Sequence, residues 1–265
     1  MAISQRRSRA FVAAALLTWS LGTAAVFGRG GGPLLAWKPS LGLEYLSRTI
    51  VWDEETRSSK LGASFALAGL EVQVFKSLTV SALAGYSFIN WNGLVFRGLP
   101  FSIDYEAGSS GGFMAGGGID AVVFTAGFWE LGATGRFLAS LGSTKKLTIS
   151  GLNEPGALEG RGTWMRLEAG PVVAYKGFEG FSPFLGGQFD RLWGAFTLDE
   201  TVKELSGSEE KKIKGKGSFA VIGGTRWEPG PSFGLNFQVS LLPAKKVGGG
   251  VSLDLGASLK AVVSF

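Results

Sequence analysis

The 265-residue chain contains neither cysteine nor histidine. Without cysteine it can form no disulfide, no thiolate metal site and no lipid anchor at an N-terminal cysteine. Without histidine it lacks the side chain that serves most often as a general base. No spacing of serine and lysine, or of carboxylates, suggests another catalytic mechanism. We therefore expect no enzyme activity, no catalytic residue, no metal site and no cofactor.

Long apolar runs are also scarce, although the composition is apolar. The mean hydropathy is +0.23 and aromatic residues make up 12%, which argues against disorder. Glycine is abundant, with 42 residues, more than double the average share of about 7%. Only the N-terminal leader could supply a membrane-spanning helix. The other apolar residues must therefore alternate with polar ones along strands, as they do in a β-barrel.

The N-terminus has the features of a secretory signal peptide, which we place at residues 1–25. Three arginines precede an apolar core at residues 11–21, and small residues at 23–25 offer a cleavage site. An uncleaved inner-membrane anchor is the alternative reading of this segment. We expect residues 26–38 to form a periplasmic lead-in and residues 39–265 to form the barrel domain.

Strand-sized apolar segments follow one another through the rest of the chain. We expect about ten strands, near residues 40–52, 61–75, 78–88, 113–124, 129–141, 163–175, 181–193, 217–227, 233–241 and 251–265. Eight or twelve strands remain possible, because boundary errors can merge or split segments. Short turns alternate with long polar connections at 90–112, 142–162 and 194–216. This asymmetry predicts a closed antiparallel transmembrane β-barrel with short periplasmic turns and long extracellular loops.

The last segment, residues 251–265, shows the clearest pattern. Its odd positions are all apolar, its even positions are polar or small except for Val262, and it ends on Phe265. It is longer than the usual strand of about five or six residues and suits a tilted bilayer crossing of about 9–11 residues. In layout and in this final strand the chain resembles small bacterial outer-membrane β-barrels of the OmpX, OmpA transmembrane-domain and OmpW types. The resemblance implies that the barrel-assembly machinery reads the strand ending at Phe265, and it carries over no functional residue.

Local features predict irregularities within this pattern. The apolar parity of the second strand changes near Gly69, which suggests a bulge. Pro171 and Pro183 each lack a ladder donor, so we expect a bulge or an irregular neighbour at both. Every tryptophan after the leader falls near an expected strand end, as the aromatic girdles of membrane barrels require.

Charged residues of the opposite parity are expected to face the lumen. They number six acids and five bases: Glu44, Arg48, Asp120, Glu130, Arg136, Arg166, Glu168, Asp190, Arg226, Asp254 and Lys260. They could line a pathway or a solute site. They could equally form a salt-bridged plug, since narrow barrels are filled by their own side chains. A nearly balanced set favours mutual neutralisation, because a selective pore carries one dominant sign.

Two connections stand out by composition. Residues 94–105 are too apolar for a free loop, so either the neighbouring strands extend above the membrane or this segment folds over or into the barrel mouth. Residues 209–216 form a charge run that is either solvated or docked on the phosphates of lipopolysaccharide or of an acidic polymer. The leader holds three of the 26 basic residues and none of the 21 acidic ones. The net charge therefore falls from +5 to +2 without it, and no nucleic-acid partner is indicated.

These patterns predict an exported bacterial outer-membrane protein in contact with membrane lipid and lipopolysaccharide. Known barrel proteases, phospholipases and lipid A acyl-modifying barrels rely on a histidine that is missing here. Two functions remain. One is a narrow channel or solute-binding barrel of weak ion selectivity, with residues 94–105 restricting its mouth. The other is a closed barrel that displays surface loops for adhesion or envelope integrity.

Overall fold

The computed structural model describes residues 36–52, 57–91, 93–100, 103–105, 108–142, 144–149, 156–202, 204–245 and 251–264. The expected signal peptide, most of the lead-in and Phe265 lie outside these ranges. The first strand begins at Ala36, before the expected start of the barrel domain at residue 39. Among the described residues, no helix is long and apolar enough to cross a membrane.

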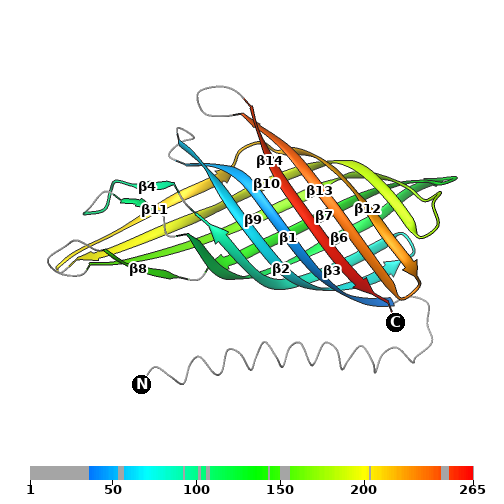
Figure 1. The fold of residues 1–265 in the computed structure, drawn as a ribbon, viewed down its shortest axis with the longest axis horizontal. Coiled ribbons are helices and arrows are strands. Elements are labelled where there is room, and N and C mark those ends of the chain that lie inside the picture. The colour runs from blue at the N-terminus through cyan, green and yellow to red at the C-terminus, as the bar shows by residue number, and fades with distance from the viewer. Residues whose placement is uncertain are drawn as a thin grey trace, which may run out of the picture.

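Ten antiparallel strands form a closed ring, which confirms the expected architecture (Figure 1). In ring order they are β1 (Ala36–Trp52), β2 (Arg57–Phe75), β3 (Leu78–Asn90), β6 (Ser109–Ala126), β7 (Trp129–Gly142), β9 (Gly156–Tyr175), β10 (Phe181–Val202), β12 (Phe219–Gly230), β13 (Phe233–Lys245) and β14 (Val251–Val263). Strand β14 closes the ring on β1, from Ser40 opposite Val262 to Ser47 opposite Leu255. The short turns all lie at one end, as expected for the periplasmic side.

Four further strands lie at or beyond the opposite end: β4 (Leu94–Phe96), β5 (Ile103–Tyr105), β8 (Lys145–Ile149) and β11 (Leu205–Gly215). Strand β11 pairs with β10 from Trp193 outward, and with β1 at Ile50 and Val51. The expectation of a long loop at 194–216 was therefore wrong. The segment is extended structure because its alternate side chains, such as Ile213, are buried on the inner face.

The parity change in β2 is not a bulge. The ladder to β1 and the ladder to β3 both run through Gly69 without a shift, and the irregularity lies at Gln73 to Phe75 instead. Leu61 and Phe65 are buried inside the barrel, whereas the apolar residues after Gly69 alternate on the other parity. The apolar face therefore changes from lumen to lipid while the register stays constant. The surroundings of β2 change along its length, whereas its backbone pairing stays regular through Gly69.

The prolines do interrupt pairing, as expected. Between β9 and β10 the ladder passes from Val172 opposite Gly186 to Ala169 opposite Phe189, and it skips Pro171 without a change of register. Pro183 lies just before the first pair of this ladder and pairs only toward β12. Each proline thus lacks a ladder partner on one side, which is where its missing N–H is tolerated.

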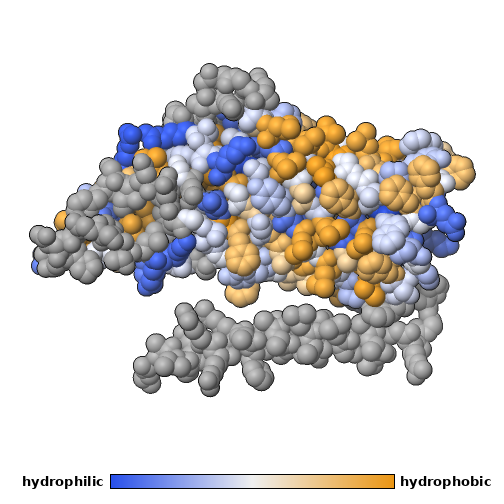
Figure 2. Space-filling view, viewed as in Figure 1, coloured by the Kyte–Doolittle hydropathy of each residue, from blue (hydrophilic) through white to orange (hydrophobic). Residues whose placement is uncertain are grey.

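Apolar side chains cover the outer wall between the two ends of the barrel. Figure 2 shows this band in orange on the face in view. Around the ring, the exposed apolar residues include Leu41, Leu43, Val80, Phe113, Ile119, Val123, Leu131, Leu167, Leu185, Val221, Leu255 and Leu259. A soluble protein does not leave so large an apolar surface in water. The band is the surface of a transmembrane β-barrel that faces lipid.

The tryptophans follow the girdle pattern only in part. Trp37, Trp129 and Trp227 are exposed at the turn end of the lipid-facing band. The expectation that every tryptophan lies near a strand end was wrong for Trp164 and Trp193, because β9 and β10 extend well beyond the expected ends. Trp164 points into the lumen and is buried there, as are Trp52 and Trp91.

Candidate functional site

The lumen contains three successive layers between the turn end and the outer end. An open vestibule comes first, a layer of paired charges follows, and an apolar core fills the outer part. Side chains that alternate along the ring strands supply all three layers. The charged layer and the core decide whether anything can pass through the barrel.

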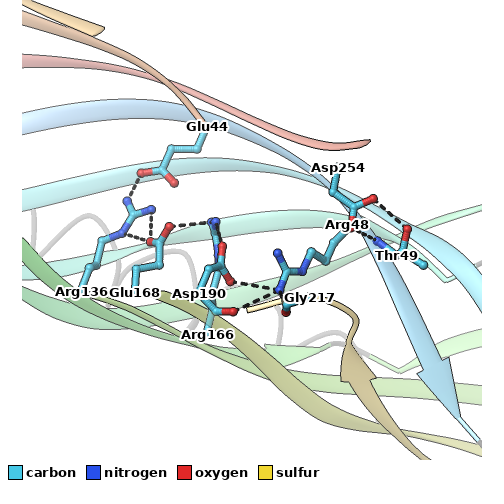
Figure 3. A network of polar contacts seen from close by, with 9 residues as sticks. All are labelled: Glu44, Arg48, Thr49, Arg136, Arg166, Glu168, Asp190, Gly217 and Asp254. Carbon is cyan, nitrogen blue, oxygen red and sulfur yellow. Dashed lines mark hydrogen bonds and ion pairs between the residues drawn. The ribbon is translucent and has the colours of Figure 1, made fainter. Parts of the chain in front are cut away.

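The charged layer begins with Arg136 on β7. Its guanidinium pairs with Glu44 on β1 and with Glu168 on β9, and the Nη2 atom lies 2.5 Å from Glu168 Oε2 (Figure 3). In the ring, β2, β3 and β6 separate β1 from β7. The pair between Arg136 and Glu44 therefore spans the lumen.

The layer continues through Arg166 and returns to β1. Arg166 Nη2 lies 2.8 Å from Glu168 Oε1 and 2.5 Å from Asp190 Oδ2. Asp190 on β10 in turn faces Arg48, whose Nη2 lies 3.5 Å from Asp190 Oδ1 and donates to the carbonyl oxygen of Gly217 at 2.8 Å. The chain of contacts starts and ends on β1. It crosses the lumen between Glu44 and Arg136, whereas at Arg48 and Asp190 only residues 216–218 separate β1 from β10 in the wall.

The layer is balanced in charge and largely withdrawn from water. It joins three arginines to three carboxylates, and Arg48, Arg166, Glu168 and Asp190 are each at most 5% exposed. Buried ions of this kind are tolerated only when each has its counter-ion, because desolvation costs several kcal/mol per charge. The geometry matches a neutral plug.

The vestibule on the turn side has a volume of about 410 Å³ and reaches down to Glu44, Arg136 and Glu168. Of the other expected lumen residues, Asp120, Glu130, Arg226 and Lys260 line it. Lys260 pairs with Glu71 at 2.7 Å, and Arg226 lies over the ring of Phe184 at 5.8 Å. Asp120 and Glu130 form no ion pair with any described residue.

Asp254 forms no ion pair with a described residue of the charged layer, and its Oδ1 lies 4.0 Å from Nζ of the exposed Lys60. It accepts hydrogen bonds from the backbone N–H of Thr49 at 2.7 Å and from the Thr49 hydroxyl at 2.8 Å. These contacts lie where β1 leaves β14 and turns to pair with β11. Asp254 therefore accepts hydrogen bonds from two Thr49 groups at the point where the ladder between β1 and β14 ends. Among the described residues, no group of three or more potential ligands is arranged to hold a metal ion.

The outer core is the part of the lumen that sequence analysis missed. Its aromatic members are Trp52, Phe65, Trp91, Phe96, Trp164 and Phe196, all between 0% and 3% exposed. Ring pairs hold the layer together, with centroids 5.5 Å apart for Phe65 and Trp164 and for Trp91 and Phe196. The parity change in β2 was the signal for this core, because it marks where apolar residues turn inward.

The described residues of this segment, 94–100 and 103–105, lie over this core, and the neighbouring strands extend beside them, so both expected alternatives hold. Leu94 and Phe96 are fully buried, and Phe96 packs against Phe196 at 5.9 Å between centroids. A side chain at Gly207 of β11 would collide with Pro100, at 2.6 Å, so the glycine allows the close approach. We call residues 94–105 the lid.

Glu209 fastens the lid to β11. Its Oε2 accepts from the backbone N–H of Gly98 at 2.7 Å, and its Oε1 lies 2.7 Å from Lys211 Nζ. Partial burial raises the pKa of Glu209, but the hydrogen bond from Lys211 and those from the backbone of Gly98 and Arg97 outweigh it and lower the pKa. The carboxylate form is the one that holds the lid.

Acid is therefore expected to loosen the lid. Because the pKa of Glu209 is lower in the folded protein, its stabilising effect is complete above the unfolded value of about 4.3 and is lost as the pH falls through the folded value. Opening would expose Trp91, so acrylamide should quench more of the fluorescence in strong acid than at neutral pH. Glu209→Ala should show the extra quenching already at neutral pH, whereas Glu159→Ala, which removes an exposed pair with Lys146, should not. Equal quenching of all three proteins at every pH would contradict this role.

Comparisons with known proteins find likeness only at the level of the general fold. No protein-family model matches the chain, and no curated protein matches it. Among solved structures, the outer membrane protease OmpT of Escherichia coli is 11% identical, with 87% of this chain and 97% of that chain covered and a TM-score of 0.45. The translocator domain of the autotransporter NalP of Neisseria meningitidis is 12% identical over 100% of both chains, with a TM-score of 0.46. The COG4313 outer membrane channel of Pseudomonas putida F1 is 13% identical over 90% and 98%, with a TM-score of 0.42. Likenesses this distant carry no functional argument for the chain.

Proposed function

We propose that the protein is an outer-membrane β-barrel with a closed lumen, which displays its outer strands at the cell surface. One observation carries the proposal. The charged layer crosses the lumen through Arg136 with Glu44, and it continues along the wall through Glu168, Arg166 and Asp190 to Arg48. Behind it the apolar core and the lid fill the outer part of the barrel. A water-filled path would need both layers to separate.

The outer extension suits display because it is built from paired strands. Strands β9, β10 and β11 continue beyond the lipid-facing band in one sheet, and β8 adds to its edge. Loops of this length are usually mobile, whereas ladder hydrogen bonds and the buried core hold this surface in one shape. A fixed surface binds a partner with less loss of conformational entropy. Adhesion or an envelope-bridging contact is the role that such a surface supports.

Cysteine labelling of intact cells tests the display, because the chain has no native cysteine. Glu204→Cys places a thiol at the exposed outer end between β10 and β11, and Lys76→Cys places one in the exposed turn between β2 and β3. A membrane-impermeant maleimide should label the first variant on intact cells and the second only after the cells are broken. Labelling of Lys76→Cys on intact cells, or no labelling of Glu204→Cys, would contradict the proposed orientation.

The vestibule favours a second candidate, a barrel that binds a small solute from the turn side. Its volume of about 410 Å³ falls within the range of small-molecule sites. Asp120 and Glu130 on β6 and β7 line one side and Arg226 on β12 lines another. None of the three forms an ion pair with a residue that the structure describes, so both signs of charge are available. Ion conduction by the refolded protein would separate a passage from a closed vestibule.

A further inference from the structure

The outward face of β9, β10 and β11 changes from apolar to basic at the outer edge of the lipid-facing band. Met165 on β9, Trp193 on β10 and Lys214 on β11 lie directly opposite one another across the sheet. In the next row outward, Lys212 lies opposite Ala195. Opposite residues have Cβ atoms about 5 Å apart, so the two lysines lie beside the tryptophan at this edge.

Arg191 is the third basic residue beside Trp193, after Lys212 and Lys214, and it lies on the membrane side of the ring. It lies opposite the lipid-facing Leu167 in the ladder between β9 and β10. It comes two residues before Trp193, so the two side chains lie on the same outward face. Its guanidinium lies 5.9 Å from the centre of the Trp193 ring, and Trp193 in turn packs near Phe137, at 6.3 Å between centroids. A long basic side chain at the edge of hydrocarbon turns its charge toward the headgroups, and the ring of Trp193 supports that direction.

No described carboxylate neutralises this group. Arg191, Lys212 and Lys214 form no ion pair with any described residue, and Glu210, the next outward residue of β11, pairs with none of them. The side chains of Lys211 and Lys212 point to opposite faces of β11, as those of successive residues in a strand do. Lys211 turns to Glu209 beneath the lid, whereas Lys212 is exposed on the outward face.

We infer that Arg191, Lys212 and Lys214 bind the phosphate of a lipid headgroup in the outer leaflet, with Trp193 against its acyl or sugar portion. The inference rests on the membrane orientation proposed above. Three unneutralised cations beside a lipid-facing surface complement a phosphorylated lipid, and the arginine fork can bind a phosphate through two hydrogen bonds. The group lies where the band ends, at the depth where headgroup phosphates lie. A free anion would gain nothing from this position or from the exposed Met165 and Leu167 beside it.

Reconstitution in bilayers of defined composition tests the inference. The refolded protein is placed in phosphatidylcholine bilayers with increasing fractions of lipid A, a glycolipid that carries phosphates, and its unfolding midpoint is followed by gel mobility. Lipid A should raise the midpoint. The variant R191Q/K212Q/K214Q should need about a hundredfold more lipid A for the same shift, because each of the three basic residues contributes about a fivefold factor at an anionic surface. The matched variant K38Q/K76Q/K146Q, which removes the same charge elsewhere, should respond as the wild type does.

Three results of this experiment would overturn the inference. An equal shift in R191Q/K212Q/K214Q, or with lipid A from which the phosphates have been removed, would overturn the inference. So would an equal shift from inorganic phosphate in pure phosphatidylcholine, which would indicate an ordinary anion site. The double variant K212Q/K214Q, which keeps Arg191, should show an intermediate loss. Because all arms use purified protein, a failure here leaves the surface-display experiment in cells unaffected.

Discussion

Removal of residues 251–265 is expected to abolish folding altogether. Strand β14 pairs with β13 along its whole described length and with β1 over eight residue pairs. Without it, both neighbours would present unpaired backbone N–H and C=O groups to hydrocarbon, and each such group costs several kcal/mol. The truncated chain should therefore show no folded band of altered mobility on unboiled gels.

A deletion of similar size that leaves the ring intact serves as the control. Removal of residues 94–105 takes away the lid and should preserve the folded band, although it exposes part of the core. Removal of Phe265 alone separates two roles of the last strand. If Phe265 is the signal for the assembly machinery, this variant should fold in detergent but fail to assemble in cells. A folded band from the chain that lacks residues 251–265 would contradict the closed ring.

Arg166→Met is expected to lower the free energy of unfolding by about 3–5 kcal/mol, the usual cost of removing one member of a buried ion pair. Arg166 is 5% exposed and lies within 2.8 Å of both Glu168 and Asp190. Its loss would leave two buried carboxylates with Arg136 and Arg48 as their remaining counter-ions. Urea titration of the protein in micelles, followed by tryptophan fluorescence, would measure the change.

Two comparisons show whether the cost comes from unpaired charge. The double variant Arg166→Met with Asp190→Asn should recover part of the loss, because one uncompensated charge is removed. Lys146→Met breaks an exposed pair with Glu159 and should change stability by no more than about 1 kcal/mol. If Arg166→Met and Lys146→Met cost the same, Arg166 is solvated and the layer is not a plug.

The strands could be predicted from the sequence wherever the outer wall faces lipid. In β14 the alternation has one cause along the whole strand, so parity alone identified its face. Strand β13 was also expected, but it runs to Lys245, beyond the expected end at 241, because Leu242 and Ala244 are buried on the inner face. The same rule failed in the outer half, where apolar residues such as Leu61 and Phe65 turn inward. Their reversed parity looked like a bulge because a single sequence does not show which side of a strand faces lipid.

The charged residues could be assigned to the lumen by parity, but their partners could not. Arg48 and Asp190 are 142 residues apart, and they meet only because β1 and β10 both hydrogen-bond to residues 216–218 in the folded barrel. The lid was predicted as a segment too apolar for solvent, whereas its attachment through Glu209 depends on β11, which had been taken for a loop. Long-range contacts of this kind follow from topology rather than from local pattern.

Planar-bilayer recording of the refolded full-length protein tests the closed lumen most directly. Because the charged layer crosses the lumen between Arg136 and Glu44 and the apolar core lies behind it, we predict no resolvable conductance steps. The protein that lacks residues 94–105 should also remain silent, since both inner layers stay in place without the lid. Stable ion-conducting steps from the intact protein would contradict the account and would make the narrow channel the better description.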